Sequence, residues 1–417
     1  MKFPDVIGIG AINYDYMFNC KATDTRSSGT DSGREDLGRP EDEVREEIEE
    51  LRQSGNMPET QIGGSALLAL KAINAIDESL SISYVGVCGQ LTDYDKRYGS
   101  ISSVKRELSF IDNQEWLFYT NDTFPEDVRF IGKSVVRLHK HIRDNIKISE
   151  GANGLLIDLI KQKEQREGVS FADFLSQAKW IHVSSLGTFE RFSEIMGYVM
   201  RAKEKNRFLR ISIDPGFQFT QYNREALQIY LKASDYVFLS RKEYLNLIIN
   251  EDLPENEKYI KLATYFNDPE NANTKVFIVK HKNRHELIDF VNGIPYVYYH
   301  SAIGYFQIYN DTGAGDCFAG GFISGVLSDR LVAYQPAAVE LGVLAAKARM
   351  TAPDSAEVYE NIKNASKSFF EQAYKNGRDS KRKKIVFFLK SHYKPVLAFI
   401  GGAIASYVIE TILSIFF

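Results

Sequence analysis

Between residues 171 and 239 the chain alternates helix-like and strand-like stretches, and this alternation restricts the possible folds more than any other feature. Each helix-like stretch precedes a short apolar run, in the pairs 171–178 and 180–184, 189–205 and 208–213, and 224–233 and 236–239. Strands that alternate with helices build right-handed βαβ units and a parallel sheet covered on both faces. We therefore predict an α/β fold with a doubly wound, mostly parallel sheet.

Further apolar runs extend this predicted sheet in both directions along the chain. Residues 5–12 and 275–280 lack polar alternation, as expected of strands that are buried on both faces. Ligands of open α/β sheets bind beyond the carboxyl ends of the strands. Asp214-Pro215-Gly216, directly after one predicted strand, is expected in that crevice.

Residues 306–324 read as a strand, a glycine-rich turn and a helix. The turn is Thr312-Gly313-Ala314-Gly315, and apolar residues then recur at helical spacing. The first N–H groups of a helix have no intrahelical partner, so such a turn can bind an anion. Asp316 at its rim is suited to accepting a proton. Taken alone, any glycine-rich strand-to-helix turn has this pattern.

The whole run from Thr312 to Phe318 resembles the C-terminal signature Asp-Thr-x-Gly-Ala-Gly-Asp-x-Phe of the ribokinase-like (PfkB) carbohydrate kinase family. The resemblance implies phosphoryl transfer from ATP with Mg²⁺. It makes Asp316 the catalytic base and gives Gly313, Ala314 and Gly315 the role of stabilising the transferred phosphoryl group, with Thr312 beside the nucleotide. The leading Asp of the signature aligns with Asn310, which affects the family's cation site near this loop.

Three further segments resemble the acceptor-binding parts of the family. They begin at Gly10, Gly63 and Glu150, and the residues that the resemblance assigns to the acceptor, a sugar or a nucleoside, are Asn13, Asp15, Gly63, Gly64 and Asn153. By themselves these are also ordinary turn or close-packing residues. The family's Asn that follows the two glycines is Leu68 here, so one polar contact to the acceptor is absent.

On the nucleotide side the resemblance is weaker. Ser240-x-x-Glu243 is similar to the family's Asn-x-x-Glu, which implies that Glu243 organises Mg²⁺, although a surface carboxylate is the alternative. The family's glycine-rich segment after the next strand is replaced by residues 280–285, Lys-His-Lys-Asn-Arg-His. Lys280 and Lys282 could bind nucleotide phosphates as charges, or this segment could be a solvated hairpin tip.

The family's lid over the sugar is harder to locate. Residues 21–60 form a charged insertion that looks partly flexible, in which Val44, Ile48 and Leu51 predict a short surface helix. Three β-rich pieces further along, 116–119, 128–131 and 134–138, predict a small sheet. We therefore expect a small β lid in the 1–375 kinase domain.

The C-terminal end has a different character. Residues 376–394 are predominantly basic, and the 23 residues 395–417 contain one charged residue, Glu410. About 20 apolar residues suffice to cross a bilayer, and the basic flank predicts that the kinase domain faces the cytosol. We predict a single-pass transmembrane helix over 395–417, with a buried C-terminal helix as the alternative. Small residues at 401, 402, 405 and 406 would suit helix pairing, which makes a homo-oligomer possible.

Composition limits the remaining classes of function. A net charge of −4 argues against nucleic-acid binding by the whole chain, and three scattered cysteines do not form a metal site. Two hypotheses follow. The first is a membrane-tethered kinase that phosphorylates a hydroxyl of a sugar or nucleoside. The second is a catalytically weak or inactive domain that senses a nucleoside or nucleotide and is coupled to the membrane helix, because several family residues are replaced.

Overall fold

The computed structural model describes residues 3–20, 34–139, 142–184, 186–248, 252–266, 275–280, 284–291, 294–301, 306–328, 335–354 and 357–372. Contacts within the chain divide it into two units, residues 1–366 and residues 367–417. The second unit is described only over residues 367–372, so the predicted basic linker and transmembrane helix lie outside the described residues. The fold below is that of the first unit.

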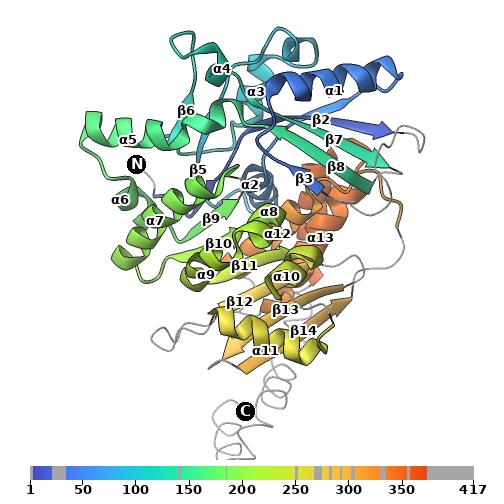
Figure 1. Ribbon diagram of the computed structural model, residues 1–417. Coiled ribbons are helices and arrows are strands. Elements are labelled where there is room, and N and C mark those ends of the chain that lie inside the picture. Colours follow the sequence, from blue (N-terminus) through green and yellow to red (C-terminus); the bar gives the residue numbers. More distant parts are fainter. Residues whose placement is uncertain are drawn as a thin grey trace, which may run out of the picture. The chain divides into compact units, whose positions relative to one another are not determined.

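The predicted α/β fold with a mostly parallel sheet is confirmed (Figure 1). Nine strands pair in the order β14-β13-β12-β11-β10-β9-β1-β5-β6. Only the edge that β13 and β14 form is antiparallel. The strands are β1 (Val6–Ile9), β5 (Ile82–Cys88), β6 (Leu117–Tyr119), β9 (Trp180–Ser184), β10 (Arg210–Asp214), β11 (Tyr236–Ser240), β12 (Lys275–Lys280), β13 (Arg284–Val291) and β14 (Ile294–Ser301).

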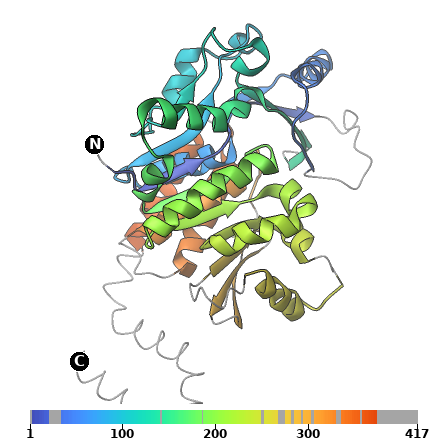
Figure 2. The ribbon, with the colours of Figure 1, turned by 60° about the vertical axis from the view of Figure 1, so that its left-hand side comes forward.

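Successive residues of the strands point to opposite faces of this sheet, and both faces are apolar. Helices therefore cover both faces and form two cores. Ile7 and Ile9 of β1 belong to one core, and Val6 belongs to the other. Figure 2 shows the green helices and the orange helices on opposite sides of the strands. One face carries α5 (Leu156–Glu167), α6 (Phe171–Ser176), α7 (Phe189–Lys205), α9 (Arg224–Ala233), α10 (Arg241–Ile248) and α11 (Glu255–Phe266). The other carries α2 (Ser65–Ile76), α12 (Ala314–Leu327) and α13 (Gln335–Thr351).

A second sheet of five strands forms the predicted small lid. Its order is β3-β8-β7-β2-β4. The strands are β2 (Asn13–Cys20), β3 (Arg34–Asp36), β4 (Glu59–Gly63), β7 (Gly132–His139) and β8 (Ile142–Ser149). Strand β2 follows β1 after three residues, so the chain passes directly from an interior strand of the large sheet into the lid.

The charged insertion contributes a helix that packs on the lid. Helix α1 (Glu41–Gln53) buries Val44, Ile48 and Leu51, which confirms the helix predicted from their spacing. Its acidic side chains pair with basic side chains of β7: Glu41 lies 2.5 Å from Lys133, and Glu47 lies 2.5 Å from Arg137. The described part of the insertion is therefore a fixed layer on the lid. Residues 21–33 lie outside the described part.

Of the three β-rich pieces predicted for the small sheet, only 134–138 lies in it, as part of β7. Residues 117–119 form β6, which pairs with β5 at the edge of the large sheet. Half of the predicted strand at 128–131 belongs to the short helix α4 (Glu126–Arg129), which begins after Pro125 with two acidic residues in its first turn, and Phe130 forms only an isolated β-bridge. Proline and acidic residues both favour a helix start, and this local preference outweighed the β-branched residues that follow. Two further helices are α3 (Ile101–Glu107) and α8 (Gly216–Tyr222).

Candidate active site

A cavity of about 340 Å³ lies at the carboxyl edge of the large sheet. The last residues of four neighbouring strands line it: Ser184 of β9, Asp214 of β10, Ser240 of β11 and Lys280 of β12. The lid and the start of α12 supply much of the remaining lining. This is the edge at which open α/β sheets bind ligands, because the loops after parallel strands diverge there.

The glycine-rich turn forms one wall of the cavity. Asn310 accepts a hydrogen bond from the N–H of Thr312 at 2.9 Å, which bends the chain ahead of the helix. Gly313 then adopts a left-handed conformation with φ +79° and caps α12, which begins at Ala314. A side chain would be strained at this φ, so glycine is required there. The oxygen of Asn310 thus supports the turn at the position where the family has Asp.

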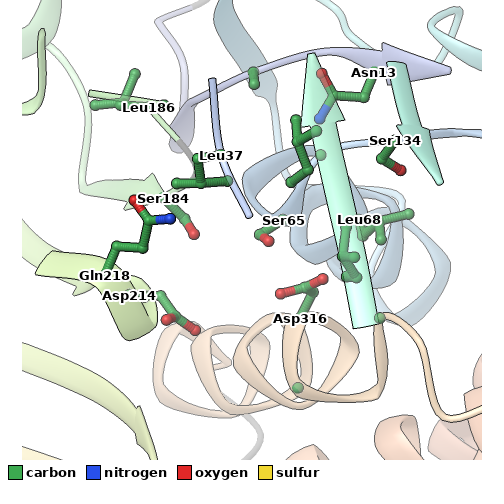
Figure 3. A pocket seen from close by; sticks show the side chains of 18 of the residues that line it. Asn13, Leu37, Ser65, Leu68, Ser134, Ser184, Leu186, Asp214, Gln218 and Asp316 are labelled. Carbon is green, nitrogen blue, oxygen red and sulfur yellow. The ribbon is translucent and has the colours of Figure 1, made fainter. Parts of the chain in front are cut away.

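Asp316 projects into the cavity from the first turn of α12. Figure 3 shows its carboxylate between Asp214 on one side and Leu68 on the other, with Asn13 and Ser134 of the lid across the cavity. A carboxylate at a helix N-terminus is favoured by the helix dipole. Two predicted site elements, the base and the acceptor side, therefore face the same space.

The turn also offers groups that suit a phosphate. The hydroxyl of Thr312 is buried and has no hydrogen-bond partner among the described residues, although Thr312 lines the cavity. A Cβ atom on Gly315 would lie 3.2 Å from Nζ of Lys280, so the absence of a side chain keeps the backbone close to this cation. The N–H of Ala314, in contrast, donates to the carbonyl of Asp311 at 3.2 Å.

Lys280 carries its charge inside the cavity. Its Nζ lies 2.8 Å from Oδ2 of Asp214. Burial alone would lower the pKa of Lys280, but the carboxylates of Asp214, Glu243 and Asp316 outweigh burial and raise it. The ammonium group is therefore held charged beside the glycine-rich turn. Lys282, the second predicted phosphate contact, lies outside the described residues.

Glu243 has a local structural role in addition to lining the cavity. It accepts the N–H of Ser240 at 2.7 Å, and the hydroxyl of Ser240 accepts the N–H of Glu243 at 3.3 Å. This reciprocal pair is a capping box at the start of α10. Serine in place of the family's Asn thus preserves the helix start and keeps Glu243 at the cavity wall.

The register of the lid strands positions Asp15. Asp15 of β2 pairs with Gln61 of β4 on one side and with Ser134 of β7 on the other. Both neighbours donate to its carboxylate, Ser134 at 2.6 Å and Gln61 at 3.2 Å. Burial raises the pKa of Asp15 to about 6, and these donors together with the charges of Lys71 and Arg349 oppose the rise. The carboxylate is held in place by both neighbouring strands.

The two glycines at positions 63 and 64 make room for the backbone and for Asp15. A Cβ atom on Gly63 would lie 1.7 Å from Oδ2 of Asp15, and one on Gly64 would lie 1.9 Å from the carbonyl of Ala11. Gly64 also has φ +118° as the N-cap of α2. Gly64 lines the cavity, whereas Gly63 acts from behind the carboxylate.

Asn153 holds the chain between the two sheets. Its Oδ1 accepts the N–H of Ile12 at 2.9 Å, and its Nδ2 lies 3.0 Å from Oδ1 of Asn13. The contact fixes the oxygen of Asn13 toward Asn153 and leaves the amide nitrogen of Asn13 directed into the cavity (Figure 3). Asn13 and Asn153 both line the cavity, as predicted for acceptor residues.

Beyond this polar region the inner face of the lid is apolar. Met17, Val136, Leu138 and Ile146 form a buried cluster. Met17 and Val136 lie two residues after Asp15 and Ser134 on their strands, and Ile146 of β8 pairs with Val136. The side chains of Val136, Ile146, Ile148, Leu37, Leu68 and Leu186 contribute to the cavity lining. The cavity thus has a polar zone where the chain enters the lid, at the start of β2, and an apolar zone beyond it.

Sequence reasoning did not single out several residues of this site. Asp214 does line the cavity, as predicted from its place at the end of a strand, but its pairing with Lys280, two strands away, was not predicted. Gln61, Ser134 and Arg349 carry no local signal, since strand pairing and helix packing bring them to Asp15. Within the described part of the chain, no helix is long and apolar enough to cross a membrane, and no cluster of three metal-binding side chains occurs.

Comparison with known proteins confirms the resemblance at the level of the fold. No family model matches the sequence, and no curated protein is a detectable relative. Among solved structures, adenosine kinase from Schistosoma mansoni with 2-fluoroadenosine has a TM-score of 0.66 at 17% identity, with 85% of this chain and 97% of that chain covered. Adenosine kinase from Anopheles gambiae gives 0.66 and 17%, covering 86% and 98%. Ribokinase from Giardia lamblia gives 0.63 and 17%, covering 87% and 99%. The chain therefore has the ribokinase-like fold.

Proposed function

We propose that this protein is an ATP-dependent kinase that phosphorylates a hydroxyl of a sugar or nucleoside. One observation carries the proposal: Asp316 projects into a cavity that the glycine-rich turn lines at one end and that Asn13 and Asp15 line at the other. A base between an anion-binding turn and a polyol-binding surface is the arrangement that phosphoryl transfer to an alcohol needs. The fold shared with adenosine kinase and ribokinase structures agrees with this chemistry.

In the proposed mechanism the residues of the chain position groups and neutralise charge. Asp15 and the amide of Asn13 hold acceptor hydroxyls, and Asp316 accepts the proton of the hydroxyl that attacks. The turn at Gly313–Asp316 and the ammonium of Lys280 stabilise negative charge on the transferred phosphoryl group. Such catalysis depends mainly on positioning and electrostatics, so the geometry of the turn matters more than any single contact.

The residues present fit the phosphates of ATP. The buried hydroxyl of Thr312 lines the cavity and has no partner among the described residues, so it is available to a phosphate oxygen. Lys280 supplies a fixed positive charge, and the absence of a side chain at Gly315 lets this charge lie beside the helix N-terminus, where both favour an anion. Lys282 remains a further candidate contact by its position in the sequence.

The residues present also fit Mg²⁺ held mainly through phosphates and water. Mg²⁺ is usually bound by one or two carboxylates together with substrate phosphates, and Glu243 and Asp214 both line the cavity. When bound, the ion would neutralise phosphate charge. Glu243 would organise it from the cavity wall, while Asp214 holds Lys280.

Two of the predicted acceptor residues are better described as positioning residues. Asn153 uses its amide within the protein and orients Asn13. Gly63 leaves the space that the carboxylate of Asp15 occupies. We therefore assign direct acceptor contact to Asn13, Asp15 and Gly64.

The distribution of polar and apolar groups in the cavity favours a nucleoside over a free sugar. A free sugar carries hydroxyls on all sides, whereas the lid offers polar groups only near Asp15 and an apolar zone beyond Val136. A nucleoside has hydroxyls at one end and a flat, largely apolar base at the other, which matches these two zones. Leu68, in place of the family's Asn, also removes a polar contact.

The C-terminal segment supports a membrane-tethered form of the enzyme. Residues 395–417 are long and apolar enough to span a bilayer, and the basic residues before them favour a cytoplasmic kinase domain. Small residues in this segment would allow two copies to pair. This part of the proposal depends on the sequence alone.

The experiment that tests the activity is phosphotransfer by the full-length protein from ATP to adenosine and to ribose. Asp316→Asn should fold normally and reduce kcat by about 10²–10⁴-fold, as expected for loss of a general base. Asp158→Asn is the matched control, because Asp158 lies in the first turn of α5 on the protein surface. Equal turnover by Asp316→Asn and wild type would overturn the mechanism.

A ligand sensor without turnover is the second candidate. It rests on the replaced family residues, such as Leu68 in place of Asn, and on the pairing of Lys280 with Asp214, which already occupies this cation. Calorimetry with adenosine and ATP, performed beside the phosphotransfer assay, separates the two functions. Binding without product supports the sensor, whereas product formation supports the kinase.

A further inference from the structure

Arg349 is a buried cation at the end of α13, with an exposed fraction of 4%. Its Nε donates to the carbonyl of Thr312 at 2.6 Å, in the glycine-rich turn. Its Nη2 donates to Oε1 of Gln61 at 3.3 Å, in the lid strand β4. One guanidinium group therefore joins the turn to the lid.

The surroundings of Arg349 do not explain it as an ordinary ion pair. Within the described part of the chain no carboxylate lies within salt-bridge distance of it, and its partners are a carbonyl, an amide oxygen and the sulfur of Met17. Burying a charge without a direct counter-ion is costly. An uncharged side chain could fill the same space at lower cost, so the charge and its fork of N–H donors require another explanation.

The contact with Gln61 reaches Asp15. Because Oε1 of Gln61 accepts from Arg349, its Nε2 must face the other way, where it donates to Oδ2 of Asp15 at 3.2 Å. Arg349 thus determines which end of the Gln61 amide meets the carboxylate. In the same network the positive charge of Arg349 acts against protonation of Asp15.

We propose that Arg349 is a positioning residue that sets the glycine-rich turn and the acceptor carboxylate Asp15 relative to each other. The inference rests on the proposed function, in which the turn holds the phosphoryl group and Asp15 holds the acceptor. A single rigid fork between them fixes the separation of the two substrates. In-line transfer is sensitive to this separation, since a displacement of about 1 Å can cost 10²-fold in rate.

The groups that face Asp15 come from four elements and allow the role of Arg349 to be isolated. Ser134 of β7 and Gln61 of β4 donate hydrogen bonds to it, and Lys71 of α2 and Arg349 of α13 are the cations that act on it. Lys71 is already paired with Glu107 at 2.8 Å. Removal of Arg349 should therefore shift protonation of Asp15 to higher pH.

The experiment compares full-length Arg349→Met, Arg349→Lys and Gln61→Leu with wild type. Lys347→Met is the control, because Lys347 lies on the same helix and contacts the ring of Phe306. For each variant, kcat and KM with adenosine and ATP are measured at pH 7.5, and the Kd for adenosine is measured by calorimetry from pH 5 to pH 8. The unfolding temperature of the unliganded protein is recorded over the same pH range.

Arg349→Met is expected to lower kcat at least tenfold and to move the pH below which adenosine binding weakens to a higher value. Arg349→Lys keeps the charge but lacks the fork, so kcat should fall while the pH profile stays that of wild type. The double variant Arg349→Met with Gln61→Leu should lose less kcat than the product of the two single losses, because both substitutions break the same connection. Lys347→Met should behave as wild type.

Two results together would overturn the inference. The pH dependence of adenosine binding would be unchanged in Arg349→Met, and the loss of kcat in the double variant would equal the product of the losses in Arg349→Met and Gln61→Leu. A purely structural role of Arg349 predicts a different result. Arg349→Met and Arg349→Lys would then lose kcat and unfolding temperature equally, with no change in the pH dependence of adenosine binding, and this result would also overturn the inference. If wild type neither binds nor phosphorylates adenosine or ribose, the proposed function fails. The pH dependence of the unfolding temperature then still tests whether Arg349 acts on Asp15.

Discussion

Lys280 and Asp214 form an ion pair across the end of the large sheet, with 2.8 Å between Nζ and Oδ2. They end β12 and β10, and β11 lies between these strands. The pair therefore spans the ligand-binding edge instead of joining neighbouring strands. It keeps a cation beside Gly315 in the absence of nucleotide, where a phosphate could replace Asp214 as its partner.

Replacing this cation should affect both nucleotide binding and stability. Lys280→Met removes a charge-assisted contact to phosphate, so we expect the KM for ATP to rise about 10–100-fold. It also leaves Asp214 without its partner, and loss of one member of a buried pair costs about 3 kcal/mol of unfolding free energy. Steady-state kinetics and chemical denaturation measure the two effects.

Lys179 provides the matched control for Lys280. It forms an ion pair of the same length, 2.8 Å, with Asp5, but its side chain is 70% exposed compared with 15% for Lys280. Exposed pairs contribute about 0–1 kcal/mol, so Lys179→Met should change stability little and leave the KM for ATP unaltered. An unchanged KM in Lys280→Met would mean that Lys280 is only structural.

The pKa of Asp15 predicts a specific pH dependence of stability. Burial raises this pKa from 3.8 to about 6, so between these values the folded protein retains a proton that the unfolded chain releases. Stability is therefore lost as pH rises from about 4 to 6, by about 3 kcal/mol in total. As the pH rises through this range, the unfolding free energy of wild type should therefore fall by this amount relative to that of Asp15→Asn. Chemical denaturation from pH 4 to pH 8 measures the change. A constant difference over this range would show that Asp15 has an ordinary pKa.

The space behind Asp15 can be tested with a single methyl group. In Gly63→Ala the new Cβ atom would lie 1.7 Å from Oδ2 of Asp15, so the carboxylate must move. We expect a higher KM for the acceptor, at least tenfold, with little change in the KM for ATP. Gly197→Ala is the control, because a Cβ atom on this α7 residue would meet nothing closer than 3.8 Å. It should be neutral or slightly stabilising.

The membrane anchor makes a prediction that is independent of catalysis. Full-length protein expressed in cells should sediment with membranes and resist extraction by high salt, because hydrophobic insertion is insensitive to ionic strength. A variant that ends at residue 394 should be released by high salt, since only its basic segment remains to bind anionic lipid. Full-length protein in the soluble fraction would contradict a membrane span.

The order of the main elements and the position of the glycine-rich turn at the start of a helix could be predicted from the sequence. Helix α7 and strand β9 begin and end at the predicted residues because their apolar periodicity and their caps are local. The turn at Gly313 and the carboxylate of Asp316 belong to one short run, so the sequence already places them next to each other. The lid strand at 128–131 was predicted wrongly, because the helix start after Pro125 competes with β propensity over a few residues.

The tertiary structure alone decided which distant groups meet at the cavity. Asp15 receives its donors from Gln61 and Ser134 through the register of three strands, and Arg349 reaches the turn only because α13 packs beside it. Local sequence encodes the glycine-rich turn and the helix after it, since these depend on neighbouring residues. The strand predicted just before that turn was wrong, because residues 306–311 have no regular secondary structure. Hydrogen bonds between residues far apart in the chain depend on strand register and helix packing, which arise only when the whole core is buried.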